Sequence, residues 1–148
     1  MTELEYDSEF IAERIFDGEI KWDRSGTTAY FGERDTDTGK AISITELIAW
    51  MSRGDICPIE SQHHAPEHWE LAVYGQQLSD TYETINMLYG GYIVSQERSD
   101  TRITIDTMYV MSPSDEELIL KIIEDIKSLF PKGDEYQIID GGMRVWWD

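Results

Sequence analysis

The chain has 148 residues, of which 30 are acidic and 12 basic, so its formal net charge is −18. This length fits one domain, and a hydrophobic content of 41% supplies enough apolar area for a core, which excludes general disorder. The charge excludes ordinary binding to DNA and to anionic membranes, because both repel a strongly acidic protein. Three interpretations of the acidity remain: a high-salt host, a nucleic-acid mimic, or a surface past which DNA slides.

A lone cysteine, Cys57, excludes an internal disulfide and suits synthesis in the cytosol. No apolar run approaches the roughly 20 residues needed to cross a bilayer. The acidic start, MTELEYDSEF, also lacks the basic and then apolar pattern of a secretory signal. We therefore expect a protein that is made and used in solution.

The first elements in the chain are predicted to be a short helix and a hairpin. Ser8 is a candidate N-cap for the helix, and Gly18 is a candidate for its end. Residues 19–32 alternate loosely about an Arg-Ser-Gly turn, which predicts a hairpin with Trp22 and Tyr30 paired across its strands.

A second helix and a long connection follow. Residues 33–41 are rich in Asp, Thr and Gly and predict an exposed loop, after which Ser43 and Glu46 form a capping box for a helix that ends at Gly54. Residues 55–68 contain two of the four prolines and all three histidines, so we expect an extended connecting loop.

Residues 69–75, WELAVYG, form a short apolar run that predicts a buried strand. Residues 76–89 fit either a helix or a strand. The pair Gly90-Gly91 favours a hairpin, because a glycine pair accepts positive φ at both central positions of a tight turn.

Residues 101–111 alternate as a strand does, with two chemically different faces. The apolar face predicted to meet the core comprises Ile103, Ile105, Tyr109 and Met111. The opposite face begins with Arg102, Thr104 and Asp106.

Residues 113–130 predict a long amphipathic helix. Its cap is either Ser112 followed by Pro113, or Ser114 with Glu117 three residues later. The predicted buried stripe comprises Ile119, Ile122, Ile123, Ile126 and Phe130. A final hairpin is predicted about Asp140-Gly141-Gly142.

The pattern as a whole predicts an α+β fold: an antiparallel sheet of about 4–6 strands with two or three helices packed mainly on one face. We expect one domain over residues 1–148. Within it, residues 1–55 form a helix-hairpin-helix lead segment, 56–68 the connecting loop, and 69–148 the sheet, the long helix and the terminal hairpin.

Four side chains of types that bind zinc lie close together in the sequence: Cys57, His63, His64 and His68. Pro66 disfavours the helical turn that would bring the last two histidines onto one face, and the spacing matches neither HExxH nor a paired-cysteine knuckle. A polar surface loop is the favoured interpretation, so no metal or other cofactor is predicted. No catalytic motif is present, and we expect a protein that is not an enzyme.

The consecutive residues Trp146 and Trp147 predict a contact surface near the end of the chain. If they lie on a strand, one must face away from the core. That side chain either contacts a partner or is covered by a helix or the N-terminal segment.

The chain is predicted to contain, in order, a short strand (WELAVYG), a hairpin through YIVSQER and TRITIDTMYVM, and a helix opened by SPSDEEL. This order of elements resembles tail-terminator proteins of long-tailed viruses. The resemblance covers about residues 66–130. Residues 1–55 are longer than the single helix of that family, and the last hairpin is shorter. The resemblance implies a ring, usually hexameric, that closes the tail tube and joins it to the connector at the head, with no catalytic residues.

The resemblance also implies partners and a location. The partners are copies of the chain itself, neighbouring virion proteins, and DNA that passes the acidic ring without specific binding; the location is the virion, assembled in the host cytoplasm. Ring closure requires two complementary patches on each copy. The candidate contacts are Arg102, Asp106 and Met108 on the exposed face of the strand, together with Trp146 or Trp147.

Two other functions stay open. A small acidic inhibitor, either a nucleic-acid mimic or an immunity protein, would act in the cytoplasm by covering a basic site on a partner. A metal-dependent or hydrolytic enzyme would use His63, His64 and His68.

Overall fold

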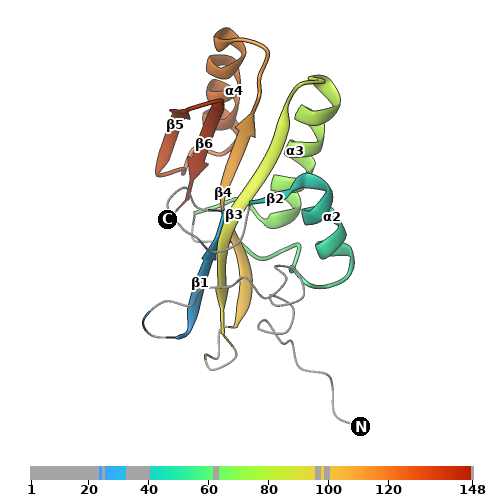
Figure 1. The fold of residues 1–148 in the computed structure, drawn as a ribbon, viewed down its shortest axis with the longest axis vertical. Coiled ribbons are helices and arrows are strands. Elements are labelled where there is room, and N and C mark those ends of the chain that lie inside the picture. The colour runs from blue at the N-terminus through green and yellow to red at the C-terminus, as the bar shows by residue number, and fades with distance from the viewer. Residues whose placement is uncertain are drawn as a thin grey trace.

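The computed structural model describes residues 24, 26–32, 41–61, 64–95, 98 and 101–147 (Figure 1). The strands are β1 (Thr28–Phe31), β2 (Ile42–Ser43), β3 (Asn86–Val94), β4 (Arg102–Met111), β5 (Glu135–Ile139) and β6 (Gly142–Trp146). The helices are α2 (Ile44–Ser52), α3 (His68–Thr81) and α4 (Glu116–Leu129). The helix predicted from Ser8 to Gly18 and the first arm of the predicted 19–32 hairpin, with Trp22, lie outside the described residues.

The described strands form one antiparallel sheet in the order β1-β3-β4-β6-β5, with β2 also paired to β3. In Figure 1, α2 and α3 lie on the side of β3, and α4 lies beside β5 and β6. Inward-facing residues of the three helices share one core with the sheet, among them Leu47, Leu71 and Ile122. The predicted α+β fold is confirmed.

Two local sequence signals gave correct elements. Ser43 and Glu46 form the predicted capping box at the start of α2, with hydrogen bonds of 3.0 and 3.1 Å between side chain and main chain. The terminal hairpin is also present, because Ile139 pairs with Gly142 across the two-residue turn formed by Asp140 and Gly141.

The predicted long helix is present as α4, but its predicted caps are wrong. Asp115 is the N-cap, and its carboxylate accepts a hydrogen bond from the Leu118 N–H at 2.8 Å. Ser112 instead has a positive φ of 59° and ends the preceding strand. The predicted buried stripe is buried or half-buried throughout: Ile119, Ile122, Ile123, Ile126 and Phe130.

The predicted strand at residues 69–75 is wrong, because these residues belong to α3. The core-facing residues from Leu71 to Leu78 repeat at helical spacing. On the opposite side of the helix, Trp69 and Val73 are exposed one turn apart. At the helix start the Glu67 main-chain N–H donates to the Glu70 carboxylate at 3.1 Å, which is half of a capping box. A window of seven residues was too short to reveal the helical period.

The hairpin turn predicted at Gly90-Gly91 is also wrong. Both glycines lie inside β3, at a point where its pairing with β4 shifts register. Gly91 pairs with Ile105 and Gly90 with Thr107, so Asp106 is the extra residue of a β-bulge. A Cβ on Gly91 would collide with the Thr104 carbonyl oxygen, so glycine is needed for close strand approach and not for a turn.

The bulge reverses which side chains of β4 meet the core. Ile103 and Ile105 face the core as predicted, but beyond Asp106 the core positions pass to Met108 and Val110. Tyr109 and Met111, which were predicted on the core face, therefore face the opposite side of the sheet. The cause is the one extra residue, which the alternation of the sequence does not show.

Candidate functional site

His68, the first residue of α3, is fully buried and has both ring nitrogens engaged. Its Nδ1 lies 2.9 Å from the Cys57 carbonyl oxygen, and its Nε2 accepts a hydrogen bond from the Ile105 main-chain N–H at 3.1 Å. The proton is therefore on Nδ1 and the imidazole is neutral. Burial lowers the pKa of His68 to about 4, while the bond to the Cys57 carbonyl opposes part of this shift.

The candidate zinc residues are not brought together. Cys57 and His64 are exposed, and His63 lies outside the described residues. His68 has no free nitrogen for a metal because it joins the connecting loop to β4. Within the part of the chain that the structure describes, no group of three or more His, Cys, Asp or Glu side chains could hold a metal ion.

Arg102 belongs to a polar cluster at one end of β4. Its guanidinium donates to the hydroxyls of Thr104 and Tyr92, both at 2.9 Å, and lies 3.4 Å from the Glu60 carboxylate. Burial raises the pKa of Glu60, and the hydrogen bond from Thr104 and the charge of Arg102 offset part of this effect. Arg102 is thus a fixed link between β4 and the connecting loop.

The other predicted contact residues have different positions. Met108 and Trp147 are fully buried in the core, because the bulge turns Met108 inward and the chain after β6 carries Trp147 under Phe130. Asp106 is also buried and accepts a hydrogen bond from the Thr107 hydroxyl at 2.8 Å. Trp146 is half-buried on β6. The structure therefore removes Met108, Asp106 and Trp147 from the exposed surface.

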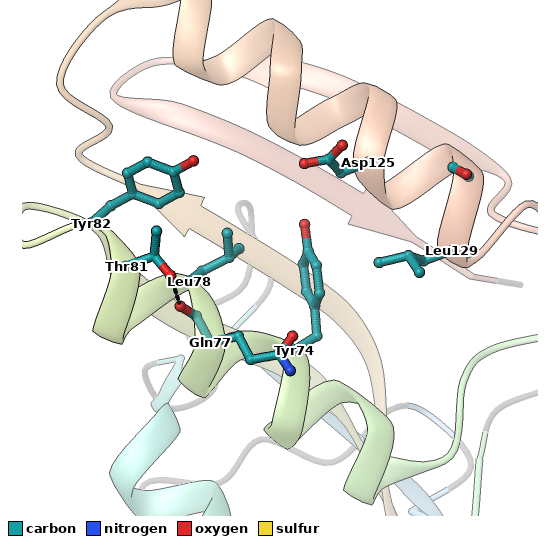
Figure 2. A pocket seen from close by; sticks show the side chains of 8 residues that line it. Tyr74, Gln77, Leu78, Thr81, Tyr82, Asp125 and Leu129 are labelled. Carbon is teal, nitrogen blue, oxygen red and sulfur yellow. Dashed lines mark hydrogen bonds between the residues drawn. The ribbon is translucent and has the colours of Figure 1, made fainter.

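A groove of about 400 Å³ lies between α3 and α4 (Figure 2). From α3 and its C-cap it is lined by Tyr74, Gln77, Leu78, Thr81 and Tyr82, and from α4 by Asp125, Ser128 and Leu129. None of these eight residues is basic. The groove therefore combines one carboxylate, two phenols and two leucine walls.

Tyr74 provides the floor of this groove. Tyr74 is 7% exposed, and its hydroxyl is buried without a hydrogen-bond partner. Figure 2 shows the ring pointing from α3 toward α4, with the hydroxyl between Asp125 and Leu129. Burial raises the Tyr74 pKa, and the charges of Asp125 and Tyr82 raise it further, so the hydroxyl stays protonated.

Phe130 connects the groove to the core. Its ring packs edge-on against Tyr74, with centroids 5.7 Å apart, and against Trp147, with centroids 6.4 Å apart. The Trp147 Nε1–H is also buried without a partner. Two buried polar groups without a hydrogen-bond partner therefore flank one phenyl ring, which is unusual in a protein interior.

An apolar pocket of about 270 Å³ lies on the sheet face opposite the helices. Its lining residues are Gly32, Ala41, Leu88, Tyr109, Met111, Ile139 and Asp140. The Tyr109 hydroxyl donates to the Gly32 carbonyl and fixes one wall. Sequence reasoning missed this pocket, because it assigned Tyr109 and Met111 to the core.

An apolar strip lies on the outer side of α3 and the loop before it. It consists of Ile59, Trp69 and Val73, which are 73%, 46% and 48% exposed. The Trp69 main-chain N–H donates to the Pro58 carbonyl at 2.9 Å, which holds the loop against the helix start. The spacing of Trp69 and Val73 could have revealed the strip, had the segment been read as a helix.

No protein-family model matches the chain, and neither a curated protein nor a solved structure matches it significantly. Each helix that the structure describes is too short or too polar to span a bilayer.

Proposed function

We propose that the chain is a non-enzymatic assembly protein whose copies form a ring through head-to-tail contacts. In the proposed setting, the ring caps the tail tube of a virus and joins it to the connector, as the resemblance to tail-terminator proteins implies. The neighbouring partners are other virion proteins, and the location is the virion after assembly in the host cytoplasm.

The observation that carries the proposal is the pair of apolar surfaces on opposite sides of the molecule. The strip of Ile59, Trp69 and Val73 lies on the outside of α3, and the pocket that contains Leu88 lies on the far face of the sheet. A closed ring requires two different patches that complement each other. The exposed Trp69 suits such a contact, because tryptophan is enriched at interface centres.

The outer edge of the sheet adds a further contact surface. Within the described residues β5 pairs only with β6, and Ile138 on β5 is 49% exposed. An open strand edge presents unpaired main-chain groups that can bind another chain. β5 also contains Ile139, which lines the apolar pocket, so this strand edge borders the pocket.

The charge supports the role assigned to the ring. Each copy adds −18, so an assembled ring is strongly negative and repels the DNA backbone. DNA could then move through the ring without being retained, and no base-reading surface is required.

The proposal is tested by sedimentation velocity on the purified protein and three neutral variants. We expect the wild type to sediment as a closed oligomer, and Trp69→Gln and Leu88→Gln to sediment as smaller species. Leu120→Gln is the matched control, because Leu120 is 52% exposed on α4 and belongs to neither surface. A wild-type monomer at every concentration and salt would contradict the ring.

That outcome would favour the acidic-inhibitor function. Four acidic residues of α4 are exposed and would form its contact surface: Glu116, Glu117, Glu124 and Asp125. The inhibitor would then bind a basic protein as a monomer, with strong dependence on salt.

A further inference from the structure

We propose that the groove between α3 and α4 binds a positively charged alkyl group, a guanidinium or an ammonium on a short apolar stem. The ligand is either a free amine or a basic side chain of another protein. This inference does not depend on ring formation, because none of the groove residues belongs to the strip or to the pocket.

The charge of the groove selects a cation. Asp125 is exposed, and it makes no ion pair or hydrogen bond with any residue that the structure describes. None of the eight lining residues carries a positive charge that would compete for this carboxylate. An incoming guanidinium or ammonium can therefore form a charge-assisted hydrogen bond with Asp125.

The buried hydroxyl of Tyr74 is the second and independent observation. A buried polar group without a partner is costly, and each such group in a native protein calls for an explanation. The hydroxyl points into the space between Asp125 and Leu129. A cation held by Asp125 would bring an N–H donor to the Tyr74 oxygen, which would accept it and so gain a hydrogen-bond partner.

The walls of the groove fit the rest of the ligand. Leu78 and Leu129 offer apolar surface to an alkyl stem, and the Tyr82 ring is half-buried at the end of α3, where a cation can lie against its face. Thr81 uses its hydroxyl proton on the Gln77 carbonyl at 2.7 Å, so its oxygen can still accept a hydrogen bond. The lining thus supplies acceptors and apolar walls, as a guanidinium on an alkyl chain requires.

The test is a titration of the folded chain with n-butylguanidinium, followed by amide chemical shifts in two-dimensional NMR. We expect saturable shifts in α3 and α4 and in the Trp147 indole N–H, which lies next to Phe130. The uncharged analogue n-butylurea should give no saturable shift. A short capped peptide with one arginine forms a second arm: if it binds more tightly than n-butylguanidinium, the natural ligand is a protein side chain, and if it binds more weakly, a free amine.

Three variants make the result specific. Asp125→Asn should weaken binding about tenfold or more, which is the effect of losing one hydrogen bond between charged groups. Glu124→Gln removes the same charge from a neighbouring exposed residue outside the groove and should leave binding unchanged. Tyr74→Phe should weaken binding while the free protein stays folded.

Equal weakening by Asp125→Asn and Glu124→Gln would show general charge attraction and would overturn the site. Equal binding of n-butylguanidinium and n-butylurea, or no saturable shift in the folded wild type, would overturn it as well. Circular dichroism of each variant verifies that a loss of binding does not come from unfolding.

Discussion

The imidazole of His68 accepts a hydrogen bond from the main-chain N–H of Ile105, 37 residues further along the chain, at 3.1 Å. Ile105 is the residue before the bulge in β4, and the other imidazole nitrogen holds the loop at Cys57. One neutral ring thus joins the connecting loop, the start of α3 and the irregular part of the sheet.

This arrangement predicts a specific pH dependence of stability. The pKa of His68 is about 4 in the folded chain and about 6.5 in the unfolded chain, so between these values only the unfolded chain takes up the proton. The contribution of His68 is complete above about pH 6.5 and falls by about 3 kcal/mol as the pH drops to about 4. Chemical denaturation at a series of pH values measures this slope.

In His68→Gln, the part of the pH dependence of the free energy of unfolding that His68 causes should be absent. His64→Gln is the control and should keep it, because His64 is exposed and outside the core. If His68→Gln does not fold, NMR of the wild type provides the test. The His68 ring resonances should stay those of the Nδ1–H tautomer from pH 8 down to pH 5. Titration of His68 near pH 6.5 would contradict the buried, neutral assignment.

Gly91→Ala should destabilise the fold strongly. A Cβ at this position would collide with the Thr104 carbonyl oxygen, so the two strands would have to separate at the bulge. We expect a loss of about 3 kcal/mol or more in the free energy of unfolding. Gly54→Ala is the control, since Gly54 has a positive φ of 81° but open space around it. Its cost should be only the backbone strain of about 1–2 kcal/mol.

Tyr74 and Tyr89 form a matched pair of buried phenols. The Tyr89 hydroxyl donates to the Leu71 carbonyl at 2.9 Å, whereas the Tyr74 hydroxyl has no partner. Tyr89→Phe should lower the free energy of unfolding by about 1 kcal/mol, because it removes a buried hydrogen bond to the Leu71 carbonyl. Tyr74→Phe should leave it unchanged or raise it. Equal losses in both variants would show that Tyr74 has a partner in solution.

The fraction of protein assembled into the ring should increase with salt, whereas a complex held by ion pairs would dissociate. Copies that each carry −18 repel one another, and raising the salt from 0.1 to 1 M shortens the screening length from about 10 to about 3 Å. The oligomer fraction in sedimentation velocity should therefore increase with salt. A decrease would indicate contacts made by ion pairs instead of the apolar strip and pocket.

Local signals carried most of the fold prediction. The capping box of Ser43 and Glu46 and the turn of Asp140 and Gly141 are set by residues adjacent in sequence, so both could be predicted. The seven-residue run at 69–75 was wrongly predicted as a strand, because a helix and a buried strand look alike over such a short window.

The candidate site could not be predicted from the sequence, for a different reason. The burial of Met108 depends on a bulge at Asp106, and the engagement of His68 depends on a strand that follows much later in the chain. The groove also needs Tyr74 and Asp125 from separate helices. Such relationships between distant segments leave no periodic pattern in the sequence.

The most direct test of the ring mixes two damaged variants. Trp69→Gln retains an intact pocket, and Leu88→Gln retains an intact strip, so an equimolar mixture can form one good contact per pair but cannot close a ring. Sedimentation equilibrium of the mixture should show heterodimers, while each variant alone stays monomeric at the same concentration. A mixture that remains entirely monomeric, or a wild type that never exceeds a monomer, would contradict the proposed head-to-tail assembly.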